Sequence, residues 1–567
     1  MFNIQAMLAE FAARILLWFV SLPALGALSA WSVFSINAMA QEGGERRGKF
    51  MLLLFLPSVL PAFGMLVIPL LAAQFDATWS PSRSEMTAWA FFFTGGIAGA
   101  LYWLRVWIPR FDRFKSKITR RTSLERNRRT DVREIETFLP QAGRGYNPRK
   151  FASHAKRNRI FIGLDERRKP VYLPYDDLRI QHILLTGRTR SNKGVAAQIL
   201  IPQLLARGEF VVVLDPKVDA WMPHVFLDAC TQAGLPYRFL DLRQSAPAQC
   251  NPFRGCDAET IENMLIGGFS LTEKGEASDF YRLADRKAAR DCATWLAKHA
   301  GMTARDALAE LGDEWLERAP AFHSYLSEMA DLDSVNATAG GVDIVDGERT
   351  GGLLYVVGDM INPRILRMQR MILLRLLFLC KQRDQTRENR TVCVFADEFK
   401  THISRPFMVS LGASAGWGLH VILAFQSLQD LKDAPDDLDK DSVQGSVTEN
   451  CAVQLSYALK DPDTAEWLSR STGTILVDDE TRTVTRNIAQ AETIHKERRI
   501  SMAERPFVDL NMFLNLPKGC GVLTCPGALA QFIYTSPPIV TRTAAALVIT
   551  PAHASSASRD PRDAIDV

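Results

Sequence analysis

Long apolar stretches occupy the first hundred residues of the chain. Residues 15–38, 51–73 and 86–104 contain no Lys, Arg, Asp or Glu, and each is near the ~20 residues that a helix needs to cross a bilayer. Buried core helices are the alternative reading, but the clustering of the stretches at one end of the chain favours a membrane. The sequence therefore predicts three transmembrane helices in a membrane anchor that spans residues 1–109.

The charges around these stretches predict the orientation of the anchor. The first connector carries Arg46, Arg47 and Lys49, whereas Arg83 is the single basic residue of the second, and a dense basic run follows over residues 105–129. Basic residues accumulate on the cytoplasmic side of membrane proteins. We therefore expect a multi-pass protein with an external amino terminus and a large cytoplasmic domain. The basic run is expected to contact lipid headgroups, with nucleic-acid phosphates as the alternative.

A cleaved signal peptide is the alternative for the first stretch, because Ala38-Met39-Ala40 resembles a small-residue cleavage site. The apolar region is too long for a signal peptide. Cleavage would also leave two spans and place the large domain outside the cell, away from ATP.

Further along, short apolar strands alternate with helical patterns. Residues 179–185 are predicted as a buried strand, residues 195–205 as a helix and residues 210–214 as a second strand, which is a unit typical of a parallel sheet. The segment between the first strand and the helix places successive backbone N–H groups and a helix N-terminus around an anion. This predicted phosphate-binding loop consists of Gly187, Arg188, Thr189, Arg190, Ser191, Asn192, Lys193, Gly194 and Val195.

The loop departs at two positions from the pattern G-x-x-x-x-G-K-[ST]. Asn192 replaces the second glycine, and Gly194 replaces the hydroxyl residue that usually binds magnesium. Asn is the non-glycine residue best able to adopt left-handed backbone geometry, so the loop can still form. Thr189, Ser191 or water would complete the magnesium shell.

Polar residues follow two later strands. The strand at residues 391–396 ends in Asp397 and Glu398, and the strand at residues 420–424 leads to Gln426. A magnesium-holding Asp beside a Glu that polarises water is what nucleotide hydrolysis requires. We therefore predict an ATP and Mg²⁺ site with Asp397 as the metal ligand and Gln426 as a γ-phosphate sensor. Its predicted catalytic residues are Lys193, Asp397, Glu398 and Gln426.

Composition changes this picture little. The net charge of +4 over 567 residues is too small to argue for nucleic-acid binding. All nine cysteines lie from Cys230 onward, and no pair has the two-residue spacing of a zinc or redox motif. We expect them to be reduced thiols in a cytoplasmic domain.

Several motifs together resemble the type IV coupling proteins, the TraD/TraG class of membrane ATPases in conjugation and type IV secretion. These motifs are TRSNKGV at 189–195, DPK at 215–217, NPF at 251–253, DEF at 397–399 and GLHVILAFQS from Gly418. Gly194 fits the family, whose members often carry glycine after the loop lysine. Three features depart from the family pattern: Asn192 is unusual in the loop, Lys400 stands where a proline is common, and three membrane spans are predicted where two are typical.

The resemblance implies an α/β fold: a RecA-like, FtsK-related P-loop motor domain with an all-α insertion, preceded by N-terminal transmembrane helices. It also implies a homo-hexameric, DNA-binding ATPase in the bacterial inner membrane. Its expected partners are single-stranded DNA, the attached relaxase and components of the type IV secretion channel. The predicted domains after the anchor are a basic linker (110–160), the first motor part (161–255), the insertion (256–342), the second motor part (343–548) and a flexible tail (549–567).

Two details of this picture stay open. The insertion is expected to contain helices at residues 284–297 and 304–319. Arg364, Arg367 and Arg370 are candidates for the arginine that a neighbouring subunit supplies in such rings, and none is assigned.

An FtsK-like translocase of double-stranded DNA and an ATP-binding substrate receptor with little hydrolysis are the alternative functions.

Overall fold

The computed structural model describes residues 145–154, 158–243, 245–273, 277–280, 282–435, 437–486, 492–549 and 552–554, with isolated positions before residue 145. The chain forms two units. The first unit contains Met1–Asp131 and Ile475–Arg505, and the second unit contains Val132–Thr474 and Pro506–Val567. Within the described part, no helix combines the length and apolar character of a membrane span. The three predicted transmembrane stretches lie outside the described residues, apart from isolated positions.

The first unit contributes most of a two-stranded sheet. Its strands are β11 (Thr474–Arg486) and β12 (Glu492–Pro506), which pair with each other.

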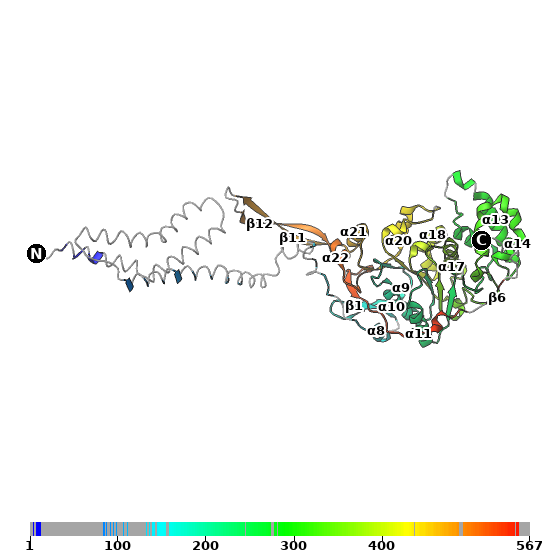
Figure 1. Ribbon diagram of the computed structural model, residues 1–567, viewed down its shortest axis with the longest axis horizontal. Helices are drawn as coiled ribbons and strands as arrows, with labels where there is room; N and C mark the ends of the chain where they lie inside the picture. The colour runs from blue at the N-terminus through cyan, green and yellow to red at the C-terminus, as the bar shows by residue number, and fades with distance from the viewer. Residues whose placement is uncertain are drawn as a thin grey trace. The chain divides into compact units, whose positions relative to one another are not determined.

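The second unit is organised around an eleven-stranded sheet with the order β2-β1-β14-β13-β10-β3-β9-β8-β4-β7-β5 (Figure 1). Its parallel strands are β3 (Ile183–Thr186), β4 (Phe210–Asp215), β5 (Tyr237–Asp241), β7 (Gly352–Val357), β8 (Val392–Ala396), β9 (Leu419–Phe425) and β10 (Val453–Tyr457). The antiparallel strands are β1 (Arg159–Leu164), β2 (Pro170–Pro174), β13 (Cys520–Thr524) and β14 (Gln531–Tyr534).

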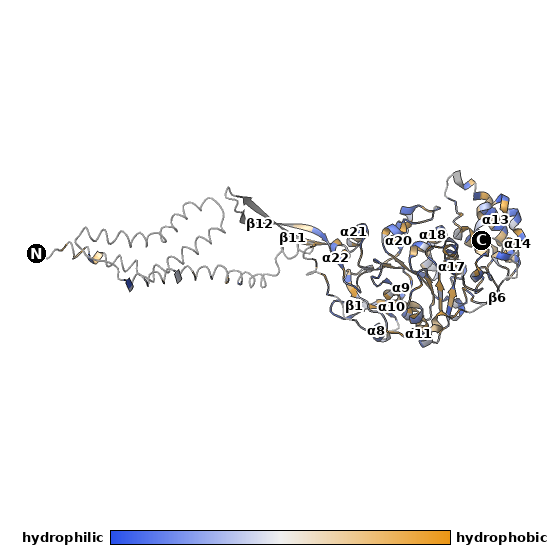
Figure 2. Cartoon of the chain, in the orientation of Figure 1, coloured by the Kyte–Doolittle hydropathy of each residue, from blue (hydrophilic) through white to orange (hydrophobic). Residues whose placement is uncertain are grey.

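Both faces of the parallel part are covered by helices. Along β4, Val211 and Val213 belong to one apolar cluster and Val212 and Leu214 to the other, because successive side chains of a strand point to opposite faces. Burial on both faces explains why these strands are almost continuously apolar (Figure 2). The first face packs against α10 (Lys193–Leu205) and α11 (Met222–Ala233), and the second against α17 (Pro363–Gln382), α18 (Arg405–Ser414) and α20 (Lys440–Asn450).

Shorter helices complete the second unit. They are α8 (Pro148–His154), α9 (Tyr175–Arg179), α16 (Gly347–Thr350), α19 (Leu428–Leu431), α21 (Pro462–Ser471) and α22 (Leu510–Asn515).

The predicted insertion contains α12 (Ala258–Gly268), α13 (Arg282–Lys298), α14 (Ala304–Arg318) and α15 (Pro320–Ala330). This confirms the helices expected at 284–297 and 304–319. A capping box fixes the start of α14: Thr303 and Asp306 satisfy each other's backbone N–H groups. The apolar side of α13, which includes Ala289 and Cys292, packs into the same cluster as the second face of the sheet.

Two expectations about the insertion and the tail need correction. The strand β6 (Ala337–Gly340) lies inside the range expected to be all helical, and β15 (Ala552–Ala554) lies inside the tail expected to be flexible. The two strands pair with each other in antiparallel orientation, with Ala552 opposite Gly340. Backbone hydrogen bonds between segments this distant along the chain leave no local pattern in the sequence.

The predicted strand at 179–185 was also too long. Arg179 ends α9, and β3 begins only at Ile183. The imidazole of His182 explains the boundary, because its Nε2 lies 2.8 Å from the carbonyl oxygen of Leu411 and its Nδ1 accepts a hydrogen bond from the N–H of Val421 at 3.2 Å. His182 is therefore held by tertiary contacts at the base of the strand.

Candidate functional site

The predicted site residues lie at one edge of the sheet. The strands β3, β9, β8 and β4 are neighbours and run parallel, so their carboxyl ends share that edge. The loop after Thr186, the acids Asp397 and Glu398, and Gln426 all follow these strand ends. The topology thus brings the predicted residues together, at the place where open parallel sheets bind ligands.

Backbone geometry explains the composition of the loop. Gly187 has φ 152°, and a Cβ there would lie 2.5 Å from the Ser191 hydroxyl oxygen and 2.9 Å from the Tyr457 Cβ. Asn192 has φ 88° and ψ 14° and lies directly before α10. This confirms the prediction that Asn192 adopts the left-handed geometry usually left to glycine.

The loop carries free hydrogen-bond donors. Within the described residues, the N–H groups of Thr189, Arg190 and Asn192 donate to no backbone carbonyl. The first turn of α10 adds N–H groups that an α-helix leaves without intrahelical acceptors. The hydroxyl of Ser191 is buried and has no hydrogen-bond partner in the described part of the chain. This arrangement suits an anion with several oxygen atoms.

Lys193 is the first residue of α10, and its side chain is buried. The ammonium group donates to the carbonyl oxygen of Gly187 and, at 3.4 Å, to that of Arg188. Burial lowers the pKa of Lys193 to about 8, and the positive charge of Lys217 acts in the same direction. A lysine held at this position without a phosphate is thus energetically unfavourable.

The acidic pair follows β8. The N–H of Asp397 donates to the carbonyl oxygen of Leu214 at 3.1 Å, and burial raises the pKa of the Asp397 carboxyl to about 6. The backbone of Glu398 adopts left-handed geometry, with φ 46°. Burial opposes the charge of Glu398, but contacts with Lys217 and Gln426 outweigh that effect and lower its pKa. One oxygen of Glu398, Oε2, is buried without a partner among the described residues.

Gln426 connects the loop to the acidic pair. Its side-chain Nε2 donates to Glu398 Oε1 at 3.0 Å, and its Oε1 accepts a hydrogen bond from the Thr189 hydroxyl at 3.1 Å. Two consecutive hydrogen bonds therefore link the loop to Glu398.

The carboxylate of Asp215 is engaged in the turn that follows β4. It accepts hydrogen bonds from the N–H groups of Lys217 at 3.0 Å and Asp219 at 2.6 Å, and also from the Tyr355 hydroxyl. Burial raises its pKa. Asp215 therefore shapes the turn after β4, and the side chain that this turn presents to the acids is Lys217.

A cavity of about 830 Å³ opens beside the loop, a volume suited to a mononucleotide-sized ligand. One wall was not apparent from the sequence, because it comes from Lys518 and residues 537–540. Beside it, the Arg542 guanidinium lies 4.1 Å from the ring centroid of Trp221. No motif marks this segment, and only the tertiary structure places it there. The cavity is lined by residues 188–195, Gln198, Lys217, Asp219, Trp221, Met222, Val225, Asp397, Lys518 and residues 537–540.

The candidate arginines do not line this cavity. Arg364 lies 3.5 Å from Asp331, and the guanidinium of Arg367 lies 4.2 Å from the ring centroid of Tyr325. Burial lowers the pKa of Arg370. Arg364 and Arg367 are thus engaged within the chain, whereas the Nε of Arg370 is buried without a hydrogen-bond partner among the described residues. None of the three is assigned as the arginine that acts on a neighbouring site.

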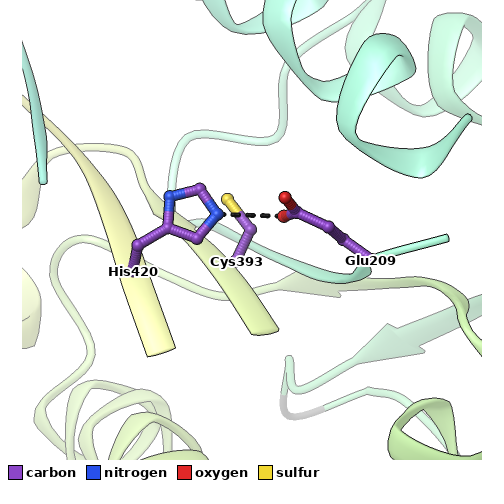
Figure 3. A group of neighbouring side chains, drawn as sticks. All are labelled: Glu209, Cys393 and His420. Atoms are coloured by element: carbon purple, nitrogen blue, oxygen red, sulfur yellow. Dashed lines mark hydrogen bonds and ion pairs between the residues drawn. The ribbon is translucent and has the colours of Figure 1, made fainter. Parts of the chain in front are cut away.

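A second group of metal-ligating residue types lies at the opposite ends of the same strands (Figure 3). Ligand atoms of Glu209, Cys393 and His420 all lie within 4.8 Å of one another. All three side chains are buried, and Glu209 Oε2 lies 2.9 Å from His420 Nε2. Burial opposes the charge of His420, but Cys393 and Glu209 outweigh it and raise the pKa of the imidazole. We interpret this group as a buried ion pair that joins β4 and β9.

Comparison with known proteins relates this site to a family. Residues 147–253 and 353–527 match the family described as type IV secretory system conjugative DNA transfer. The two segments together make up about half of the chain, and over them the chain is similar to this family. The match leaves out residues 254–352, which contain the helices α12 to α15.

Individual relatives agree with this similarity. Mobilization protein A of Escherichia coli is 29% identical over 330 residues, and the match covers 57% of this chain and 60% of that protein's length. The bacterial conjugative coupling protein TrwBdeltaN70, in its unbound monoclinic form, aligns with a TM-score of 0.51 and 15% identity. This alignment covers 71% of the present chain and 95% of the TrwBdeltaN70 chain. The plasmid coupling protein TrwB in complex with ADP and Mg²⁺ aligns with a TM-score of 0.50 and 16% identity. This alignment covers 73% of the present chain and 98% of the TrwB chain. These likenesses show that the chain shares the RecA-like P-loop α/β fold of these solved proteins.

Proposed function

We propose that this protein is an inner-membrane ATPase coupling protein that links relaxase-bound single-stranded DNA to a type IV secretion channel and drives conjugative transfer. The observation that carries the proposal is the connected path from the loop through Thr189 and Gln426 to Glu398, in a chain similar to the conjugative DNA transfer family. Such a path couples the occupancy of a phosphate-binding loop to a carboxylate that can act on water.

The side chains present fit ATP and Mg²⁺. The free N–H groups of the loop and the ammonium of Lys193 bind the phosphates. Asp397 and the hydroxyl of Ser191 hold the metal; Ser191 is preferred over Thr189 because its oxygen has no partner among the described residues, whereas Thr189 is bonded to Gln426. When bound, magnesium neutralises charge on the phosphate oxygens.

The remaining roles fall to Glu398 and Gln426. Glu398 orients the attacking water and accepts its proton through Oε2, which is buried and unpaired in the described part of the chain. Gln426 responds to the γ-phosphate, because it is hydrogen-bonded to both the loop and Glu398. Release of the phosphate alters the position of Thr189, and Gln426 passes that change to the acid.

The anchor and the assembly belong to the same proposal. The apolar stretches at 15–38, 51–73 and 86–104 would hold the chain in the bacterial inner membrane as a multi-pass protein, with the motor in the cytoplasm. A homo-hexameric ring would give DNA a central path and let neighbouring subunits complete each other's sites.

A conjugation assay tests the proposal. The variant Lys193→Ala should lose plasmid transfer while remaining in the membrane fraction at the wild-type level. The matched control is Lys381→Ala, which removes an exposed lysine of α17 and should transfer normally. Normal transfer by a stably expressed Lys193→Ala protein would contradict the proposal.

The DNA that stimulates hydrolysis separates the alternatives. The full chain in lipid nanodiscs should hydrolyse ATP faster with single-stranded than with double-stranded DNA. Preference for duplex DNA would favour an FtsK-like translocase, and nucleotide binding without hydrolysis would favour a substrate receptor.

A further inference from the structure

Lys217 lies at the centre of the acidic part of the site, although neither the loop pattern nor the acidic motif includes it. It follows β4 by two residues, and the turn that carries it is held by the carboxylate of Asp215. The Tyr355 hydroxyl donates to the same carboxylate. The fold therefore presents Lys217 from a fixed turn and not from a loose loop.

The ammonium of Lys217 pairs with both acids. Its Nζ lies 3.5 Å from Asp397 Oδ2 and makes an ion pair with Glu398 Oε1. The side chains of Asp397 and Glu398 are 7% and 1% exposed, whereas that of Lys217 is 32% exposed and lines the cavity. The acids are thus fixed and buried, and their cation can reach the ligand.

Lys193 acts on these acids without direct contact, because its charge lowers the pKa of both but its effect on each is smaller than that of Lys217. Its hydrogen bonds go to the carbonyl oxygens of Gly187 and Arg188, and no ion pair joins it to an acid of the described residues. Two adjacent buried carboxylates without a cation would be strongly unfavourable. Lys217 is therefore the cation that compensates their charge by direct contact.

The same carboxylates are those that the proposed function assigns to magnesium and to the attacking water. A cation on Asp397 and an ammonium 3.5 Å from its Oδ2 repel each other strongly in a partly buried site. The Lys217 side chain must move when metal and nucleotide bind. The nearest favourable partners in the cavity would be phosphate oxygens.

We propose that Lys217 is a positioning residue: it holds Asp397 and Glu398 in place before Mg²⁺ and ATP bind, and then transfers its ammonium from the carboxylates to a phosphate oxygen. This proposal rests on the proposed function and deepens it. The transfer removes the cation from Glu398 only when nucleotide is present, so the carboxylate becomes more basic and its Oε2 can accept the proton of water at that stage.

Binding measurements on the full chain in nanodiscs test the proposal. With Lys217→Met, Mg²⁺ alone should bind about tenfold more tightly, because two carboxylates have lost their cation. ATP in the presence of EDTA should bind about tenfold more weakly, because a phosphate contact is lost; each change corresponds to ~1.4 kcal/mol. A purely structural role would weaken both, so the opposite signs distinguish the two. Lys217→Arg, which keeps the charge, should restore both affinities toward the wild type.

Lys400→Met is the matched control. Lys400 lies two residues after Glu398 but is directed to Asp430 at 3.8 Å and Asp433 at 3.7 Å, so both affinities should stay unchanged. Identical Mg²⁺ and ATP affinities for Lys217→Met and the wild type would overturn the role of Lys217 alone. A wild-type protein that binds no ATP would instead overturn the proposed function, and the transfer step with it.

Discussion

Because the ammonium of Lys193 is buried, we expect it to lower the free energy of unfolding when no phosphate is bound. Its pKa falls from the ordinary lysine value of 10.5 to about 8, mainly through burial, with Lys217 acting in the same direction and Glu398, Asp397 and Asp430 against it. At about 1.4 kcal/mol per pKa unit, the charged form destabilises the fold by about 3 kcal/mol at pH 7. Lys193→Met should relieve this penalty.

The hydrogen bonds of the ammonium reduce the expected gain. Replacement with Met removes its donors to the carbonyl oxygens of Gly187 and Arg188, which lie beside the cavity and can bond to water. The net gain in the free energy of unfolding is then about 2 kcal/mol. For a unit of this size, that corresponds to a rise in melting temperature of about 2 °C or somewhat more.

The pH dependence has a defined sign. Because the pKa of Lys193 is lower in the folded protein, the unfolded chain binds the proton more tightly and stability rises with pH in this range. The penalty is complete below pH 8 and disappears as pH approaches 10.5. The stability difference between the variant and the wild type should therefore shrink by about 1 kcal/mol from pH 7 to pH 9.

Thermal unfolding of the nucleotide-free full chain in nanodiscs, followed by tryptophan fluorescence at both pH values, measures this effect. Lys381→Met, at an exposed position of α17, should leave the melting temperature unchanged. The reasoning would be refuted if Lys193→Met melted at or below the wild-type temperature, or if its advantage grew with pH.

Three further outcomes are expected. ATP affinity should fall by up to about tenfold per pH unit above pH 8, because binding must first protonate Lys193. Calorimetry at pH 7 and pH 9 would measure this fall, and an affinity independent of pH would contradict the prediction. Asn192→Gly should keep the ATP affinity of the wild type, and Asn192→Ala should lower it. Alanine at φ 88° is strained by about 1 kcal/mol. Equal ATP affinities for the two variants would mean that the loop does not need left-handed geometry at this position. Glu398→Gln should bind ATP but slow single-turnover hydrolysis by a factor of about 10² to 10⁴, and hydrolysis at the wild-type rate would remove Glu398 from the mechanism.

The amino-acid sequence was sufficient to predict local elements and backbone preferences. The apolar runs 210–214 and 391–396 matched strands to within a residue, because strands buried on both faces require continuous apolar residues. Asn192 was recognisable as a left-handed residue because that preference belongs to its own backbone and side chain. The positions of Asp397, Glu398 and Gln426 at strand ends, and of Lys193 at the start of a helix, followed from the order of short elements along the chain.

The contacts between groups that are distant along the chain became apparent from the folded structure. Lys217 pairs with acids 180 residues away along the chain, and Asp215 holds the turn that makes this contact. The wall formed by Lys518 and residues 537–540 arises because the antiparallel strands β13 and β14 join the sheet beside β10. The physical reason is common to these cases: the energy of an ion pair, a cavity wall or a strand partner depends on three-dimensional distance, and a pattern of neighbouring residues carries no record of it.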